Sequence, residues 1–82
     1  MDYIARTPDQ LGPLLRSCRK QRRMTQKATG AMVGLKQGTI SAIEADPART
    51  SINTLYKLLS ALDLELVIRD KRMDPTHKKR EW

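Results

Sequence analysis

Apolar residues in the first half of the chain are spaced as on helices that each bury one face. A first helix is predicted over residues 9–23, with Pro13 in its first turn, because four apolar residues follow the spacing i, i+3, i+4, i+7: Leu11, Leu14, Leu15 and Cys18. A short second helix is predicted over residues 26–33, with the Thr25 hydroxyl as its N-cap and Gly34 as its stop.

Two further helices are predicted beyond Gly34. The third spans residues 37–44, and its isoleucines at positions 40 and 43 face inward. Asp46-Pro47 breaks the pattern, and Thr50 or Ser51 can cap a fourth helix whose buried face is formed by Ile52, Leu55, Leu58, Leu59 and Leu62. Four helices with tight joins within residues 9–63 predict an all-α fold, a compact helical bundle.

Residues 64–70 change the pattern. Polar and apolar residues alternate in part, and a β-branched pair favours a short strand, although the segment could instead extend the fourth helix. A lone strand is unstable with both edges unpaired, and a second copy offers the same strand as a partner. We therefore interpret 64–70 as a C-terminal β-strand for homodimerisation, with four apolar contact residues: Leu64, Leu66, Val67 and Ile68.

The ends of the chain are expected to lie outside the bundle. Residues 1–8 form an N-terminal extension, and residues 71–82 lack apolar periodicity and form a flexible tail. The tail ends in Trp82, a large aromatic with no core to join, which is either an interface anchor or an unimportant terminal residue.

The chain of 82 residues carries 16 Lys and Arg against 9 Asp and Glu, a formal net charge of +7. Residues 10–43 contain seven of the basic residues and no acid, so the net charge belongs to that stretch. No apolar run is long enough to span a membrane, and no signal peptide is recognisable, so we expect a cytoplasmic protein. The single cysteine, Cys18, excludes an internal disulfide and is expected to be buried; we expect neither a metal site nor a cofactor.

Residues 25–44 predict a helix, a tight glycine-containing turn and a second helix, which is how a reading helix is presented to the DNA major groove. Ala28 and Ala31 are expected to allow close helix packing. Four residues at the exposed start of the third helix are candidates for reading bases: Lys36, Gln37, Gly38 and Ser41. Candidates for binding phosphate are Arg16, Arg19, Lys20, Arg23, Gln26, Lys27 and Thr39. Glu44 is interpreted as the structural partner of a basic side chain.

The residues that carry this pattern resemble the phage-repressor and Cro-type (XRE) helix-turn-helix family: Thr25-Gln26, Ala31, Gly34-Leu35, Gln37, Thr39-Ile40-Ser41 and Ile43-Glu44. The resemblance covers residues 9–63 and implies a lambda-repressor-like fold, a phosphate-binding role for Gln26 and a position against DNA for Gly38. Thr29 and Gly30 depart from the family pattern, and Gly30 is expected to weaken the second helix by about 1 kcal/mol relative to alanine.

A narrower resemblance is to the HipB family of antitoxins, carried by Lys36 to Ser41, by the strand after the fourth helix and by the ending Glu81-Trp82. It implies a dimeric transcriptional repressor that binds a palindromic operator, is associated with the nucleoid when bound, and is the antitoxin of a HipA-like Ser/Thr kinase toxin that contacts Trp82. The alternatives are a stand-alone XRE-family regulator without a toxin and, from another class, an RNA-binding or scaffold module. No catalytic constellation is recognisable, so we do not expect an enzyme.

Overall fold

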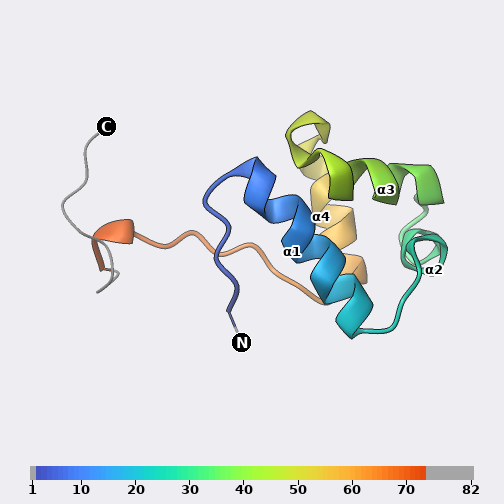
Figure 1. The fold of residues 1–82 in the computed structure, drawn as a ribbon, viewed down its shortest axis with the longest axis horizontal. Coiled ribbons are helices and arrows are strands. Elements are labelled where there is room, and N and C mark those ends of the chain that lie inside the picture. The colour runs from blue at the N-terminus through green and yellow to red at the C-terminus, as the bar shows by residue number, and fades with distance from the viewer. Residues whose placement is uncertain (1, 74–82) are drawn as a thin grey trace.

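The computed structural model describes residues 2–73, and its regular elements are all helical (Figure 1). In chain order these are α1 (Pro8–Gln21), α2 (Gln26–Ala31), α3 (Gln37–Ala45), the 3-10 turn η1 (Pro47–Arg49), α4 (Ile52–Ala61) and the 3-10 turn η2 (Lys71–Met73). The predicted all-α bundle with a helix-turn-helix is confirmed. No helix of the part described is long and apolar enough to cross a membrane.

Helices α1, α3 and α4 enclose one small core. It is built from Leu15 and Cys18 of α1, Ile40 and Ile43 of α3, and Leu58, Leu59 and Leu62 at the end of α4. On α1 the predicted burial of Leu15 and Cys18 is confirmed and Leu11 packs against the core, whereas Leu14 is only half-buried and lies outside it; the inward isoleucines of α3 are confirmed. Ile52 was predicted to be buried and is instead 67% exposed, because it occupies the first turn of α4, beyond the edge of the core.

Three chain reversals share one geometry. Each contains a residue with positive φ two or three positions beyond the last helical residue: Arg23 (56°), Gly34 (71°) and Asp63 (56°). The next residue donates its N–H to the carbonyl five positions earlier, over 3.2 Å from Met24 to Arg19, 2.8 Å from Leu35 to Gly30 and 2.8 Å from Leu64 to Leu59. The side chains of Met24, Leu35 and Leu64 then pack against the core, as in a Schellman motif. The predicted stop at Gly34 is confirmed.

Helix α1 begins earlier than predicted. Thr7 is its N-cap, its Oγ1 accepting from the Gln10 N–H at 3.3 Å, and Pro8 occupies the first helical position. Pro13 therefore lies inside the helix and not in its first turn, contrary to the prediction. Gly12 precedes it and packs against α3, where a Cβ atom would lie 2.3 Å from the Glu44 carbonyl oxygen.

Helix α2 turns a different face to the core than expected. Ala28 and Ala31 are exposed, whereas Thr29 and Gly30 are buried. The Thr29 hydroxyl donates to the Thr25 carbonyl oxygen at 2.8 Å, so its burial leaves no unsatisfied donor. A Cβ atom on Gly30 would lie 2.3 Å from the Leu35 carbonyl oxygen, so glycine is required where the turn folds back on α2.

Residues 64–70 leave the bundle after α4 and form neither helix nor strand within this chain (Figure 1). The alternative that this segment continues the fourth helix is wrong, because α4 ends at Ala61 and Asp63 reverses the chain. The expected tail begins with η2, and its remainder, including Trp82, lies outside the described residues.

Candidate nucleic-acid interface

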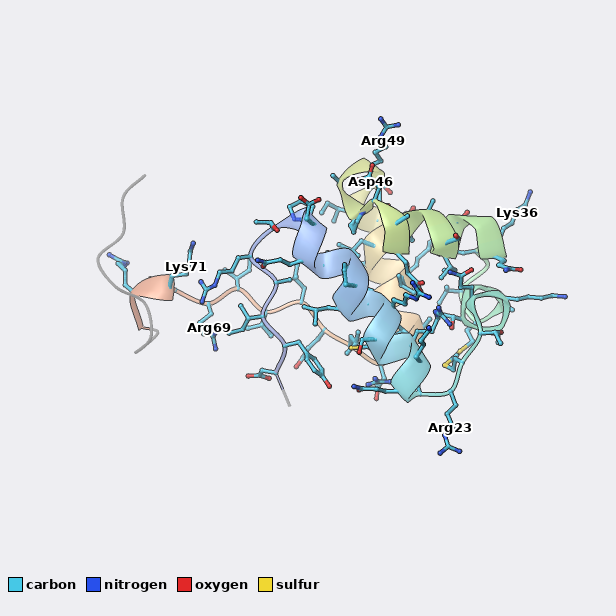
Figure 2. The ribbon with its side chains drawn as sticks, in the orientation of Figure 1. Arg23, Lys36, Asp46, Arg49, Arg69 and Lys71 are labelled. Atoms are coloured by element: carbon cyan, nitrogen blue, oxygen red, sulfur yellow. The ribbon has the colours of Figure 1, made fainter. Side chains whose placement is uncertain are left out.

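Helix α3 presents three of its residues on one exposed face. Gln37, Gly38 and Ser41 are exposed, while Ile40 and Ile43 fix the helix to the core from behind. Lys36 is the N-cap residue of α3, and its side chain makes no cap hydrogen bond. Figure 2 shows Lys36 projecting into solvent at the start of α3. The four predicted base-reading residues are therefore brought together on one accessible surface.

The rest of this face is small and uncharged, which the sequence analysis did not anticipate. Ala42 and Ala45 are exposed beside Ser41, and no acid lies among the exposed residues of α3. Small side chains allow a helix to enter the major groove deeply, and alanine can contact the methyl group of thymine. Ala42 is therefore a further candidate for base contact.

A groove of about 350 Å³ lies beside α3. It is lined by Gly38, Thr39, Ala42, Ile43, Arg49, Thr50, Ser51 and Thr54. Arg49 was missed by the sequence analysis because it lies outside the acid-free stretch and close to Asp46. Its Nε lies 3.3 Å from the Asp46 carboxylate in an exposed, weak ion pair. Figure 2 shows Arg49 and Lys36 at opposite ends of α3.

Arg19 is not on the surface with the other predicted phosphate-binding residues. Its Nε donates to Glu44 Oε2 at 2.6 Å and its Nη2 to Oε1 at 3.2 Å, and both side chains are less than a tenth exposed. Arg19 Nη1 also donates to the Met24 carbonyl oxygen at 2.8 Å. The predicted role of Glu44 as the partner of a basic side chain is confirmed, with Arg19 as that partner.

Gln26, the first residue of α2, joins this cluster. Its Nε2 donates to Glu44 Oε1 at 3.1 Å, so one carboxylate links α1, α2 and α3. The Thr25 hydroxyl caps α2 by accepting from the Ala28 N–H at 3.0 Å, as predicted. The cluster holds the reading helix in a fixed orientation relative to the rest of the bundle.

The remaining basic candidates, Arg16, Lys20, Arg23 and Lys27, are exposed, and Thr39 is half-buried in the groove beside α3. Figure 2 shows Arg23 projecting from the end of α1 away from α3, so the basic residues do not form a single cluster. Among residues 2–73 no group of three or more His, Cys, Asp and Glu side chains could hold a metal ion.

The predicted dimerisation residues divide into two kinds. Leu64 is half-buried and packs against the chain's own core. Leu66, Val67 and Ile68 are 54%, 69% and 94% exposed, so three consecutive apolar residues face solvent.

Comparisons with known proteins agree with this geometry. A helix-turn-helix family matches residues 15–68. Antitoxin HipB of Escherichia coli O6:H1 is 35% identical over 66 residues, which are 80% of this chain and 70% of the relative. An uncharacterized HTH-type transcriptional regulator of Sinorhizobium fredii is 36% identical over 61 residues, 74% of this chain and 31% of that protein.

Solved structures with a similar fold agree with these sequence matches. A chain of a HipA–HipB–O2–O3 complex is 33% identical and superimposes with a TM-score of 0.78, covering 85% of this chain and 97% of that one. A polar reading face on α3, a fixed α2–α3 turn and matches over most of both chains together assign the family. The chain belongs to the helix-turn-helix family, within the HipB antitoxins.

Proposed function

We propose that the chain is a homodimeric, sequence-specific DNA-binding repressor that acts as the antitoxin of a HipA-like Ser/Thr kinase and represses its own operon. The observation that carries the proposal is the acid-free exposed face of α3, with a basic residue at each end. The names of the similar proteins, an antitoxin and a HipA–HipB–O2–O3 complex, support the antitoxin role.

In this proposal Lys36, Gln37, Gly38 and Ser41 read bases, with Gln37 pairing with adenine and Lys36 with guanine. Phosphates are bound by Arg16, Lys20, Arg23, Gln26, Lys27, Thr39 and the newly found Arg49. Arg19 is assigned a structural role, because its guanidinium is buried against Glu44.

The proposed organisation follows from these roles. Residues 9–63 bind DNA, residues 64–70 pair as a strand between two copies, and the N-terminal extension and the tail flank them. The two reading helices of the dimer lie about 34 Å apart, in successive major grooves of a palindromic operator. The protein is then associated with the nucleoid while it represses, and Trp82 contacts the toxin.

The experiment compares Gln37→Ala with Gln21→Ala, an exposed glutamine at the end of α1. Binding of the dimer to DNA from its own promoter and to variants of each base pair is measured by fluorescence anisotropy. Gln37→Ala is expected to relax discrimination at one base pair of each half-site, by about 1–3 kcal/mol, while Gln21→Ala changes nothing. Unchanged discrimination in Gln37→Ala contradicts the proposed reading face.

A second candidate, a stand-alone regulator without a toxin, is favoured by the similarity to the Sinorhizobium fredii regulator. Copurification with the product of the neighbouring gene, using the full chain and a chain lacking Trp82, separates the two. A partner held by the full chain and lost on deletion supports the antitoxin. Absence of any bound partner supports the stand-alone regulator.

A further inference from the structure

The segment 64–70 carries a self-complementary arrangement of charge around Val67. Glu65 lies two residues before Val67 and Arg69 two residues after it. In an extended chain these three side chains share one face, while Leu64, Leu66 and Ile68 share the other with Asp70 at its end. Both Glu65 and Arg69 are exposed, and neither forms an ion pair within residues 2–73.

We propose that residues 64–70 of two copies pair antiparallel about a two-fold axis through Val67, which sets Glu65 opposite the partner's Arg69. This register rests on the proposed dimer and defines it further. The same axis repeats every contact, so each dimer contains two such ion pairs and two contacts of Leu66 with the partner's Ile68.

Other pairings of the same segment lose these contacts. A shift by one residue sets the apolar face of one copy on the polar face of the other. A shift by two residues sets either Glu65 opposite the partner's Val67 or Val67 opposite the partner's Arg69. A parallel arrangement sets Glu65 against Glu65 and Arg69 against Arg69, and like charges in direct opposition destabilise a pair of strands.

The bundle offers a surface on which such a ribbon can rest. A groove of about 680 Å³ lies between α4 and the first residues of the segment. Tyr56, Leu59, Leu64 and Leu66 form its apolar lining, and Ser60, Asp63 and Glu65 form its polar lining. Two strands alone are marginally stable in water and need a helix or further strands to cover one face. We therefore expect the paired ribbon to turn the face with Leu64, Leu66 and Ile68 toward α4, and the face with Glu65, Val67 and Arg69 toward solvent.

The register is tested by cysteine cross-linking in the full chain. Val67→Cys, Leu66→Cys and Ile68→Cys are oxidised under identical conditions and separated on a non-reducing gel. The native Cys18 is 3% exposed, so the introduced thiol is the reactive one. Only residue 67 lies opposite its own copy in this register, so Val67→Cys is expected to cross-link several-fold faster than the other two. Fastest cross-linking at 66 or 68, or equal rates at all three, overturns the register.

Charge reversal tests the ion pairs independently. Glu65→Arg and Arg69→Glu each set like charges in opposition twice per dimer, and each is expected to raise the dissociation constant on the order of ten-fold. The double variant restores opposite charges and is expected to return to the wild-type value. An equimolar mixture of the two single variants is expected to form heterodimers in preference to either homodimer.

The two single variants change the net charge in opposite directions, so weakening in both cannot come from overall repulsion. Sedimentation equilibrium gives the dissociation constants, and circular dichroism checks that the helices of these surface variants are retained. A dimer that does not respond to either reversal overturns the ion pairs while leaving the proposed dimer in place. A wild-type chain that stays monomeric at high concentration overturns the dimer in the proposed function as well, whereas DNA reading by α3 is measured separately.

Discussion

The role of each of three glycines depends on the space around the position that a Cβ atom would occupy. Gly12 and Gly30 lie where a helix meets a backbone carbonyl group, and a Cβ atom at either would be 2.3 Å from that oxygen. Gly38, by contrast, lies in open space, and no atom is within 4 Å of where its Cβ atom would lie. The contrast lets one substitution, glycine to alanine, separate packing from DNA contact.

Gly30→Ala is expected to destabilise the protein although alanine is the better helix former. The propensity gain of up to about 1 kcal/mol is outweighed by the clash with the Leu35 carbonyl, and overpacking costs about 1–3 kcal/mol. Urea denaturation followed by circular dichroism measures the midpoint. A midpoint at or above that of the wild type contradicts the close approach.

Gly38→Ala is expected to leave the fold intact or stabilise it slightly, because the added methyl group meets no atom of the chain. The same methyl group lies on the proposed reading face, and operator affinity is expected to fall on the order of ten-fold. Parallel measurements of unfolding and of operator binding check both halves. Full operator affinity in this variant places Gly38 outside the DNA contact.

At the scale of elements, one carboxylate holds helices α1, α2 and α3 together. Glu44 near the end of α3 accepts hydrogen bonds from Arg19 of α1 and Gln26 of α2. A buried ion pair is weak evidence for stability, yet the loss of one partner leaves a buried charge without compensation.

Glu44→Gln is therefore expected to destabilise the protein by about 3 kcal/mol, since Arg19 stays charged and buried. Combining it with Arg19→Met removes the stranded charge, and the double variant is expected to be more stable than Glu44→Gln alone. A double-mutant cycle from denaturation curves measures the coupling. Additive effects of the two substitutions contradict a coupled pair.

Pro13 is the second feature at this scale. Inside α1 it has no N–H to donate to the Asp9 carbonyl, and an internal proline costs about 3 kcal/mol in helix propensity. Pro13→Ala is expected to raise the free energy of unfolding by about 1–2 kcal/mol, after the larger entropy of the unfolded alanine chain is included.

Pro8→Ala is the matched control, because Pro8 occupies the first helical position, where no N–H is needed. Thermal unfolding of both variants checks the difference. Equal effects of the two substitutions show that the position within α1 is immaterial.

The sequence predicted the helices well where apolar residues recur at helical spacing, as along α1 and at the end of α4. It did not predict the buried face of α2, because hydropathy favours burial of Ala28 and Ala31, whereas the structure buries Thr29 and Gly30. The close approach of Gly30 to Leu35 depends on how the turn folds back, which spacing alone does not describe. Pairing of residues 64–70 depends on a second chain, so it could be proposed but not read from one copy.

The candidate site was also predicted only in part. The positions on α3 follow from the motif, and the structural role of Glu44 was anticipated. Which basic side chain forms the ion pair with Glu44 depends on how α1 packs on α3. From charge alone, Arg19 was expected on the surface. Arg49 approaches α3 only because η1 folds beside it.

At the scale of the whole molecule, the two proposed contact surfaces lie apart. Figure 1 shows α3 on one side of the bundle, while residues 64–73 extend away from the bundle toward the opposite end of the long axis. Pairing of two copies through that segment leaves α3 of each uncovered, so one molecule can dimerise and read DNA at the same time.

The charge of the molecule predicts a steep dependence of DNA binding on salt. A dimer that makes about 6–10 phosphate contacts is expected to lose about 10³–10⁵ in affinity between 50 and 200 mM salt. Titrations over this range measure the slope of affinity against salt concentration. Lys27→Ala is expected to make the slope shallower and Gln37→Ala to leave it unchanged. A flat response in the wild type contradicts the electrostatic part of the proposed function.

The three reversals at Arg23, Gly34 and Asp63 have a consequence for the order of folding. Each is closed by a hydrogen bond that spans five residues, so the turns form from neighbours along the chain. Helical domains built from local contacts fold in microseconds to milliseconds. We therefore expect each copy to be fully folded long before it meets a second one, and the concentration of the protein then sets how fast the repressor assembles.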